Sequence, residues 1–205
     1  EGRGTVKKLT ADKPGDHISF IYTADTSKTK IFDLWLSRSG SKAIKVVDTL
    51  NKSLPLNWSV SENGNLSFSD DGTRLFFGTA PRPVKEAEDT LLDEEKYRLD
   101  IWSWTDDLLQ PMQKKQLSEE LKRTYQAVWH TDKGVMFQLA DSLVPSLRTY
   151  LKGNSDFALA SSDLLYRRSS SWDTRNYTDY YLVNVETGTR KLLFENTPSQ
   201  LYLSP

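Results

Sequence analysis

Apolar and polar positions alternate on both sides of a tight turn in the segment LSFSDDGTRLFF, residues 66–77. Leu66 and Phe68 alternate with serines, Asp71 and Gly72 interrupt the run, and the alternation then resumes. A period of two is typical of a β-strand with one buried face. Asp-Gly is favoured in two-residue hairpin loops, where φ is positive and glycine has no steric cost. The pattern therefore predicts a β-hairpin that turns at Asp71-Gly72.

The same order of strand, polar turn and strand recurs along the chain. Four further hairpins are expected at residues 31–49, 99–113, 148–161 and 179–195, with Trp35, Trp102, Tyr150 and Tyr181 as their aromatic markers. Repeats of roughly 40 to 50 residues are typical of propeller blades, each of which is a four-stranded sheet. Each marker hairpin would be the outer pair of a blade, and residues 66–80 and 127–140 would supply inner pairs. We therefore expect an all-β fold, in which residues 1–205 form a single partial β-propeller of about four four-stranded antiparallel blades.

Two stretches depart from this pattern. Residues 81–95 are bounded by proline and rich in acidic side chains, which predicts a surface loop or short helical excursion inserted into a blade. Residues 116–123 predict one helical turn. The final QLYLSP resembles the opening of another inner strand, and the chain begins without Met. We therefore expect a processed or truncated piece of a longer protein.

Composition narrows the classes of partner. Aromatic residues make up 11% of the chain, which favours strands. The net charge is −1 and basic residues are scattered, so we expect no nucleic-acid partner. No apolar run approaches the ~20 residues of a membrane-spanning helix, and no membrane span is expected. The absence of cysteine excludes disulfides, cysteine-bound zinc and thiol nucleophiles.

Catalytic and metal-binding patterns are sparse. The G-x-S-x-G elbow of α/β-hydrolases is absent. His17 and His130 are the two candidate imidazoles, and we expect both to be structural or solvated. The acidic residues between 86 and 95 lack the spacing and central glycine of a calcium loop. The sequence therefore predicts no catalytic residue, no metal site and no cofactor in this chain.

One polar stretch combines residues that could form the rim of a pocket. In YRRSSSWDTRNY, residues 166–177, we single out Arg167, Trp172 and Arg175. Guanidinium groups bind carboxylates with two hydrogen bonds, and tryptophan supplies contact area. The alternative is a loop that connects two blades, with Trp172 packed against its neighbour. Arg82, between two prolines, has the same two interpretations.

Several phrases together resemble a known family. LSFSDDGTRLFFGTAPRP, IWSWTDDLLQP and WDTRNYTDYYL, in this order, resemble the N-terminal propeller of bacterial serine peptidases of the prolyl oligopeptidase family. The resemblance covers the chain from about residue 50 onward. It implies a propeller that restricts the access of peptides to a C-terminal α/β-hydrolase domain with a Ser-Asp-His triad. No triad residue matches a position here, so this chain would be non-catalytic.

The resemblance also implies partners and a compartment. The partners would be the protein's own C-terminal hydrolase domain and the peptide substrate of the parent peptidase, and the parent would be a periplasmic or secreted bacterial protein. The alternative is a stand-alone periplasmic propeller that serves as a protein-interaction platform. A propeller glycosidase or lyase would need paired inward carboxylates, and no such pair is singled out by the spacing. Because an open propeller exposes sheet edges and apolar faces, we also expect self-association.

Overall fold

Thirteen strands form three antiparallel sheets in the part of the chain that the structure describes. A computed structural model of the chain describes residues 4–84, 99, 101 and 103–204. The first sheet contains β1 (Thr5–Ala11), β2 (His17–Thr23), β3 (Asp33–Arg38) and β4 (Ile44–Val47). The second contains β5 (Trp58–Val60), β6 (Ser67–Phe68), β7 (Arg74–Pro81), β8 (Tyr125–His130) and β9 (Val135–Gln138). The third contains β10 (Ser146–Arg148), β11 (Phe157–Ser162), β12 (Thr178–Asn184) and β13 (Arg190–Thr197).

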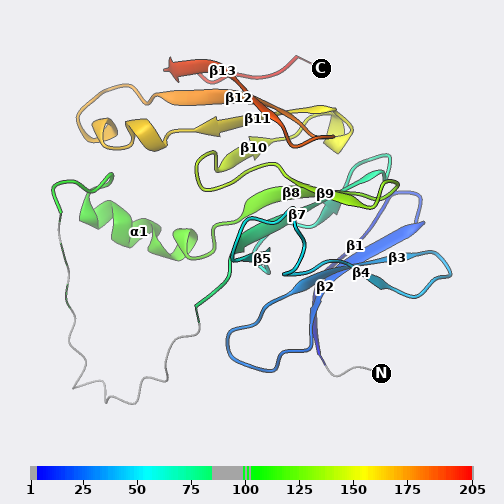
Figure 1. Cartoon of the computed structure of the whole chain (residues 1–205). Coiled ribbons are helices and arrows are strands. Elements are labelled where there is room, and N and C mark those ends of the chain that lie inside the picture. Colours follow the sequence, from blue (N-terminus) through cyan, green and yellow to red (C-terminus); the bar gives the residue numbers. More distant parts are fainter. Residues whose placement is uncertain (1–3, 85–98, 100, 102, 205) are drawn as a thin grey trace.

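The order of the strands is that of successive propeller blades. In the first and third sheets each strand pairs with the next along the chain, and in the second sheet β5 and β6 both pair with β7, which is followed by β8 and β9. The chain then passes from the last strand of one sheet to the first strand of the next, and the three sheets lie one above another (Figure 1). The predicted all-β, partial propeller architecture of antiparallel blades is confirmed, with a short fifth strand, β6, in the second sheet.

Two apolar cores hold the three sheets together. Because successive side chains of a strand point to opposite faces, Phe77 of β7 packs toward the first sheet and Phe76 toward the third. The core between the first and second sheets includes Ile21, Leu34, Leu36, Leu75, Phe77, Ala127, Trp129 and Met136. The core between the second and third sheets includes Phe76, Val128, Leu139, Val144, Ala158, Ala160, Val183 and Val185. The second sheet is therefore covered on both faces.

The hairpin predicted around Asp71-Gly72 is present, but its loop is longer than expected. Ser67 pairs with Phe76 and Phe68 with Leu75, so the loop spans residues 69–73. Gly72 has a φ of 74°, whereas Asp71 is not among the residues with positive φ. The Asp71 carboxylate instead accepts hydrogen bonds from the Ser69 hydroxyl and from the Thr73 N–H. The aspartate thus stabilises the turn through its side chain.

The described residues form three blades where the sequence predicted about four. Residues 66–80 and 127–140 were expected to belong to different blades, but β7 and β8 are hydrogen-bonded neighbours, with Phe77 opposite Ala127. Both segments therefore belong to the second sheet, and residues 82–124 form an excursion within it. The pairing depends on a contact between distant segments, which the local pattern does not encode.

The hairpin predicted at residues 99–113 is wrong over its described part. Residues 103–109 form turns and bends, and α1 (Gln110–Glu120) follows with Pro111 in its first turn. Proline has no N–H to donate to a sheet and is well tolerated at the start of a helix. The helical turn expected at 116–123 lies partly within α1. Residues 100 and 102, which include the marker Trp102, and residues 85–98 lie outside the described residues.

The strand expected from Gln200 onward is not formed in residues 200–204. This segment lies on the face of the third sheet that is turned away from the second. The Leu203 N–H donates to the Tyr150 hydroxyl at 3.1 Å, and the Tyr180 hydroxyl donates to the Ser199 carbonyl at 3.2 Å. With no neighbouring strand, its backbone has no ladder to join. None of the helices within the described ranges is both long enough and apolar enough to cross a bilayer.

Polar contacts also join the sheets. The Arg74 guanidinium on β7 donates to the carbonyls of Gly153 and Ser155 and forms ion pairs with Asp156 and Glu186, all of which belong to the third sheet or its turns. On the other side, Arg38 of β3 donates to the Thr131 carbonyl at 2.8 Å. These contacts lie at the end of the sheets where the hairpin turns are short.

Candidate functional site

The two ends of the sheets differ in how elaborate their connections are. At one end the connections are short: residues 12–16, 39–43, 69–73, 131–134, 149–156 and 185–189. We name the other end the extended end. There β2 is joined to β3 by residues 24–32, β7 to β8 by residues 82–124, and β11 to β12 by residues 163–177 (Figure 1). Long loops on a rigid scaffold are where binding residues concentrate. The extended end is therefore where we expect a binding site.

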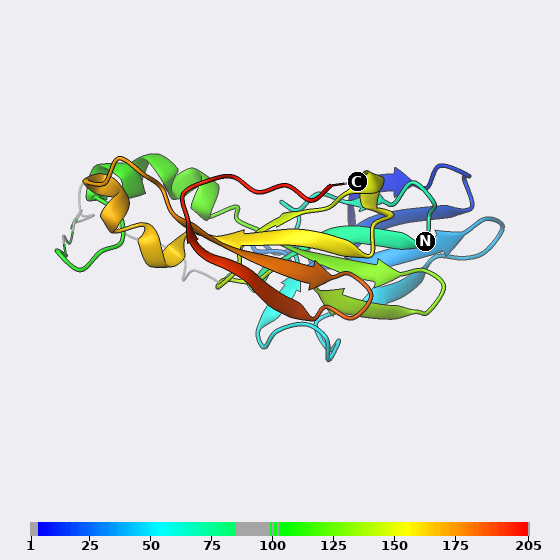
Figure 2. The same cartoon turned by 90° about the horizontal axis from the view of Figure 1, so that it is seen from above.

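A groove opens at the extended end between α1 and the connection from β11 to β12. Both views place these two segments side by side (Figures 1 and 2). The groove, here named the α1 groove, has a volume of about 480 Å³. Its lining comprises Leu108, Met112, Gln116, Glu119, Glu120, Arg123, Asp163, Tyr166, Arg167, Ser170, Asn176, Tyr177 and Thr178. The lining is mainly polar, so the groove suits a ligand that forms hydrogen bonds.

The charged residues of the α1 groove are largely paired with one another. Arg123 forms an ion pair with Glu120, and its hydrogen bond lowers the pKa of the Glu120 carboxyl below the ordinary value of 4.5. Arg167 forms an ion pair with Asp163 at 3.1 Å. The two guanidinium groups are thus already engaged, and a carboxylate ligand would have to compete for them.

The aromatic side of the α1 groove is fixed to the third sheet. The Tyr166 hydroxyl donates to the Asp179 carboxylate at 2.6 Å, and this hydrogen bond raises the pKa of Tyr166. The rings of Tyr166 and Tyr177 lie 6.0 Å apart. The Ser170 hydroxyl donates to the Arg167 carbonyl at 2.6 Å, so it is directed at its own loop and not toward a base. The arrangement can bind and orient a ligand.

The structure separates the three residues predicted as a pocket rim. Arg167 lines the α1 groove. Trp172 is 72% exposed and lines a neighbouring hollow of about 110 Å³ together with Trp104 and Arg168. Arg175 lines neither, and its backbone N–H donates to Asp173. The pocket-rim role of the three stays a prediction.

The alternative predicted for residues 166–177 was a loop that connects two blades, with Trp172 packed against its neighbour, and this alternative is wrong. Residues 163–177 join β11 to β12 within one sheet, so they do not connect two blades. Trp172 is exposed and not packed into a neighbouring blade. Arg82 is structural: its guanidinium donates to the carbonyls of Thr49 and Trp58 and so holds the connection from β4 to β5.

Sequence reasoning missed Arg168. Its guanidinium lies over the Trp104 ring, 5.3 Å from the centroid, and donates to the Trp104 carbonyl at 3.3 Å. This contact joins the excursion of the second sheet to a loop of the third. The adjacent arginines 167 and 168 are a feature that the sequence shows, but the neighbouring residues do not indicate that Arg168 contacts Trp104.

Both histidines have structural partners. His17 is the first residue of β2, and its Nδ1 lies 2.7 Å from the Asp12 carboxylate. His130 ends β8 and is buried, with Nε2 3.2 Å from the Val185 carbonyl. Among the described residues, no group of three acidic or histidine side chains is placed to hold a metal ion. The acidic stretch at 86–95 lies outside the described residues.

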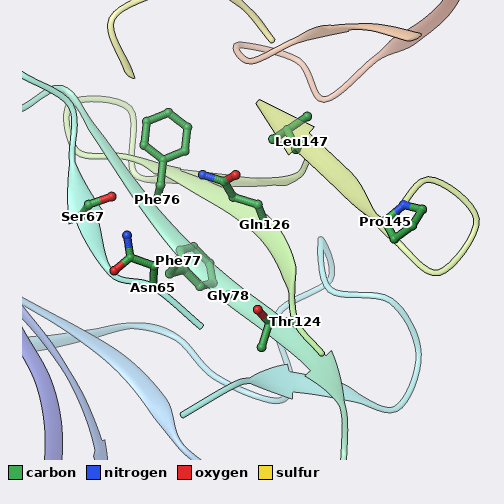
Figure 3. A pocket seen from close by; sticks show the side chains of 9 residues that line it. All are labelled: Asn65, Ser67, Phe76, Phe77, Gly78, Thr124, Gln126, Pro145 and Leu147. Carbon is green, nitrogen blue, oxygen red and sulfur yellow. The ribbon is translucent and has the colours of Figure 1, made fainter. Parts of the chain in front are cut away.

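A second cavity lies between the second and third sheets. Its volume is about 260 Å³, and Figure 3 shows its lining: Asn65, Ser67, Phe76, Phe77, Gly78, Thr124, Gln126, Pro145 and Leu147. These residues come from β6, β7, β8, β10 and the segments beside them. None of them was predicted to form a cavity, because they lie far apart along the chain.

The comparisons with known proteins found solved structures with a similar fold and nothing more. No protein-family model and no curated protein matches the chain. Among solved structures, it is similar to a prolyl endopeptidase (11% identity, TM-score 0.46, covering 95% of this chain and 23% of that one). It is also similar to the β-propeller domain of the trilobed protease from Pyrococcus furiosus (11%, TM-score 0.40, 94% and 42%). A third is a protein from Agrobacterium tumefaciens named after TolB (10%, TM-score 0.35, 94% and 49%).

This chain therefore spans less than half of the length of each of these three solved chains. Two of these three structures are peptidases or parts of them, and the third is not named as a peptidase. The assignment to the propeller fold rests on the order of the strands in this chain.

Proposed function

We propose that this chain is a non-catalytic propeller segment of a periplasmic or secreted serine peptidase. Its role is to restrict the access of peptides to a hydrolase domain encoded outside these 205 residues. The observation that carries the proposal is the series of three consecutive blades with long connections at one end only. The ordered phrases that resemble prolyl oligopeptidase propellers support the same class of parent.

The extended end is the surface we assign to contact with the hydrolase domain. Trp104 is 83% exposed and Trp172 is 72% exposed, and Leu109 and Leu165 are exposed on the same two connections. Exposed apolar side chains that gather on loops mark interaction surfaces. In this proposal the catalytic domain covers these residues, and peptides must pass the propeller to reach the triad.

The experiment compares this chain with the product of the full reading frame on a proline-containing chromogenic peptide. We expect the long protein to hydrolyse the peptide, a serine-reactive inhibitor to abolish that activity, and this chain to be inactive. If both proteins are inactive, the peptidase assignment is overturned.

The gating role needs a separate readout. Replacing Trp104 and Trp172 by serine in the long protein should raise cleavage of a large unfolded substrate such as casein relative to the short peptide. Val135→Ser, at the opposite end of the second sheet, is the control and should leave the ratio unchanged. An unchanged ratio in the tryptophan variant would rule out the extended end as the gate.

A stand-alone interaction platform is the second candidate function. The exposed apolar residues of the extended end favour it as well, because they would serve a separate partner equally well. The two candidates differ in the reading frame: a G-x-S-x-G segment downstream supports the peptidase, and its absence together with inactivity supports the platform.

A further inference from the structure

The cavity between the second and third sheets lies beside a position of β7 that has no side chain, Gly78. Phe76 and Gly78 both point toward the third sheet, since they are two residues apart. Phe76 belongs to the apolar core, whereas a Cβ at residue 78 would lie 2.5 Å from the Cα of Gly64. The turn at residues 61–64 therefore lies against the backbone of β7, and the apolar packing ends beside it. The cavity occupies the space beyond.

Four of the residues that line this cavity have polar side chains. Asn65 and Ser67 come from the β6 side, and Thr124 and Gln126 come from the start of β8 (Figure 3). All four line the cavity, and none of the four side chains hydrogen-bonds to another described residue. Asn65 is exposed and the other three residues are half-buried, so all four polar groups are open to a ligand that enters the cavity.

The chemistry of these groups restricts the class of ligand. A carboxamide offers both N–H donors and a carbonyl acceptor, and a hydroxyl can donate and accept. No charged side chain lines the cavity. An ionic ligand would therefore lose its hydration without gaining an opposite charge, which is unfavourable. The cavity suits a neutral ligand that carries both donors and acceptors.

We propose that this cavity binds a short, uncharged segment of polypeptide main chain. A peptide group carries one N–H and one C=O, which the carboxamides of Asn65 and Gln126 can pair with in both directions. Pro145 and Leu147, which are half-buried, provide the apolar wall for a small side chain. The volume of about 260 Å³ is below the ~300–1,000 Å³ of pockets for drug-sized ligands, so only a short segment fits.

A neutral oligosaccharide offers similar donors and acceptors, but the cavity suits it less well. Sugar rings bind by stacking on an exposed aromatic face, and Phe76 is only 4% exposed. The inference deepens the proposed function, because it gives peptides a place to dock on the propeller, and it rests on that function for the origin of the peptide. The binding itself is a property of this chain alone.

The test titrates the 205-residue chain with N-acetyl-tetraalanine amide, an uncharged peptide, and follows the side-chain NH₂ signals of Asn65 and Gln126 by NMR. We expect both signals to shift. The double variant Asn65→Leu/Gln126→Leu keeps the approximate size of the side chains and removes their hydrogen bonds, and it should weaken binding about tenfold or more. Asn63→Leu is the matched control, because Asn63 is exposed in the same turn and does not line the cavity.

Three results would overturn the proposal: no shift at millimolar peptide, unchanged affinity in the double variant, or shifts with maltotriose and none with the peptide. If the double variant does not fold, the titration of the natural chain decides. Because no hydrolysis is measured, this experiment can fail while the peptidase assignment stands, and the reverse also holds.

Discussion

Arg74 shows at the scale of a single residue how the second and third sheets are held together. Its side chain is 7% exposed, and it is paired with Asp156 and Glu186 and with two backbone carbonyls. A buried guanidinium is stable only when its donors are satisfied. Arginine fits here because its planar fork reaches several acceptors at once.

Removal of Arg74 should destabilise the chain. Arg74→Met leaves Glu186 and the carbonyls without their donor, and we expect the free energy of unfolding to fall by about 3 kcal/mol, the low end for a broken buried ion pair, because Asp156 is largely exposed. Urea unfolding measures the change. Arg123→Met removes an ion pair on the exposed α1 groove and should cost less than about 1 kcal/mol. Equal losses in both variants would contradict this account of Arg74.

Glu186 should make this contact sensitive to acid. Hydrogen bonds from Lys133 and Arg74 lower the pKa of its carboxyl below the ordinary value of 4.5. Because the pKa is depressed in the folded state, the stabilisation is present above the unfolded value and is lost as the pH falls through the folded value.

Urea midpoints measured at a series of pH values from neutral to acidic test this dependence. Glu186→Gln should be less stable than the natural chain at neutral pH and should lose less of its stability on acidification. Glu62→Gln, which removes an exposed ion pair with Lys7, is the control and should keep the natural acid dependence. The same acid dependence in Glu186→Gln would show that another group is responsible.

The candidate sites could be predicted only in part from residues. The stretch 166–177 was recognised as a polar loop with arginines and tryptophan, and it does lie at the extended end. The sequence did not show which of these side chains have a partner. In the structure Arg167 is paired with Asp163, whereas Asn65 and Gln126 line one cavity without a hydrogen bond to a described side chain. Asn65 and Gln126 are far apart along the chain, and the pairing of β7 with β8 brings them to the same cavity.

At the scale of elements, α1 stands apart from the rest of the molecule. None of its residues is buried, and its N-cap residue Leu109 makes no side-chain capping hydrogen bond. Helices this short are marginal in water unless packing supports them. We therefore expect α1 to open without unfolding of the sheets.

A proline inside α1 tests this independence. Lys115→Pro should break the helix locally, at a cost of about 3 kcal/mol for α1 itself, but it should shift the free energy of global unfolding by less than about 0.5 kcal/mol. Circular dichroism reports the lost helix and urea unfolding reports global stability. Lys115→Ala should leave both nearly unchanged. A large global shift in the proline variant would mean that α1 is part of the cooperative core.

Elements were predictable where the pattern is local. The hairpins at 31–49 and 179–195 are present, since each combines an alternating run with a turn and needs only its own residues. The hairpin predicted at 148–161 is only partly correct: β10 ends at Arg148, the marker Tyr150 lies in the connection to β11, and the pair is the first of the third sheet, not an outer pair. The segment 99–113 contains aromatic residues typical of strands, yet residues 103–109 form turns and α1 follows. Among the described residues no strand lies beside residues 103–109, and a strand without a partner leaves its hydrogen-bonding groups unpaired.

At the scale of the whole molecule, the first sheet has a face that nothing covers among the described residues. Phe20, Tyr22 and Trp35 point away from the second sheet and pack on one another, with ring centroids 6.4 Å apart for Phe20 and Trp35 and 5.8 Å for Tyr22 and Trp35. Ile18 and Val6 are exposed on the same sheet. Aromatic faces of this kind favour association.

Self-association through this face is the expected consequence. Sedimentation velocity over a range of concentrations should show a concentration-dependent dimer, and Phe20→Lys should weaken it about tenfold, because it places a charge in the aromatic cluster. Leu9→Lys is the control, since Leu9 is exposed on β1 and makes no ring contact in the cluster. A monomer at all concentrations would contradict the prediction.

The sequence by itself determined the class of fold and most of the hairpins. An alternating pattern and a turn residue such as Gly72 act within a few positions, so they can be read locally. Tertiary structure alone decided the number of blades, the position of the excursion and the free polar groups of the interblade cavity. These features depend on pairing across residues 82–124 and on the close approach of Gly64 to Gly78, where the absence of two side chains lets backbones meet. Contacts between distant segments are fixed by packing of the whole chain, and no local pattern contains them.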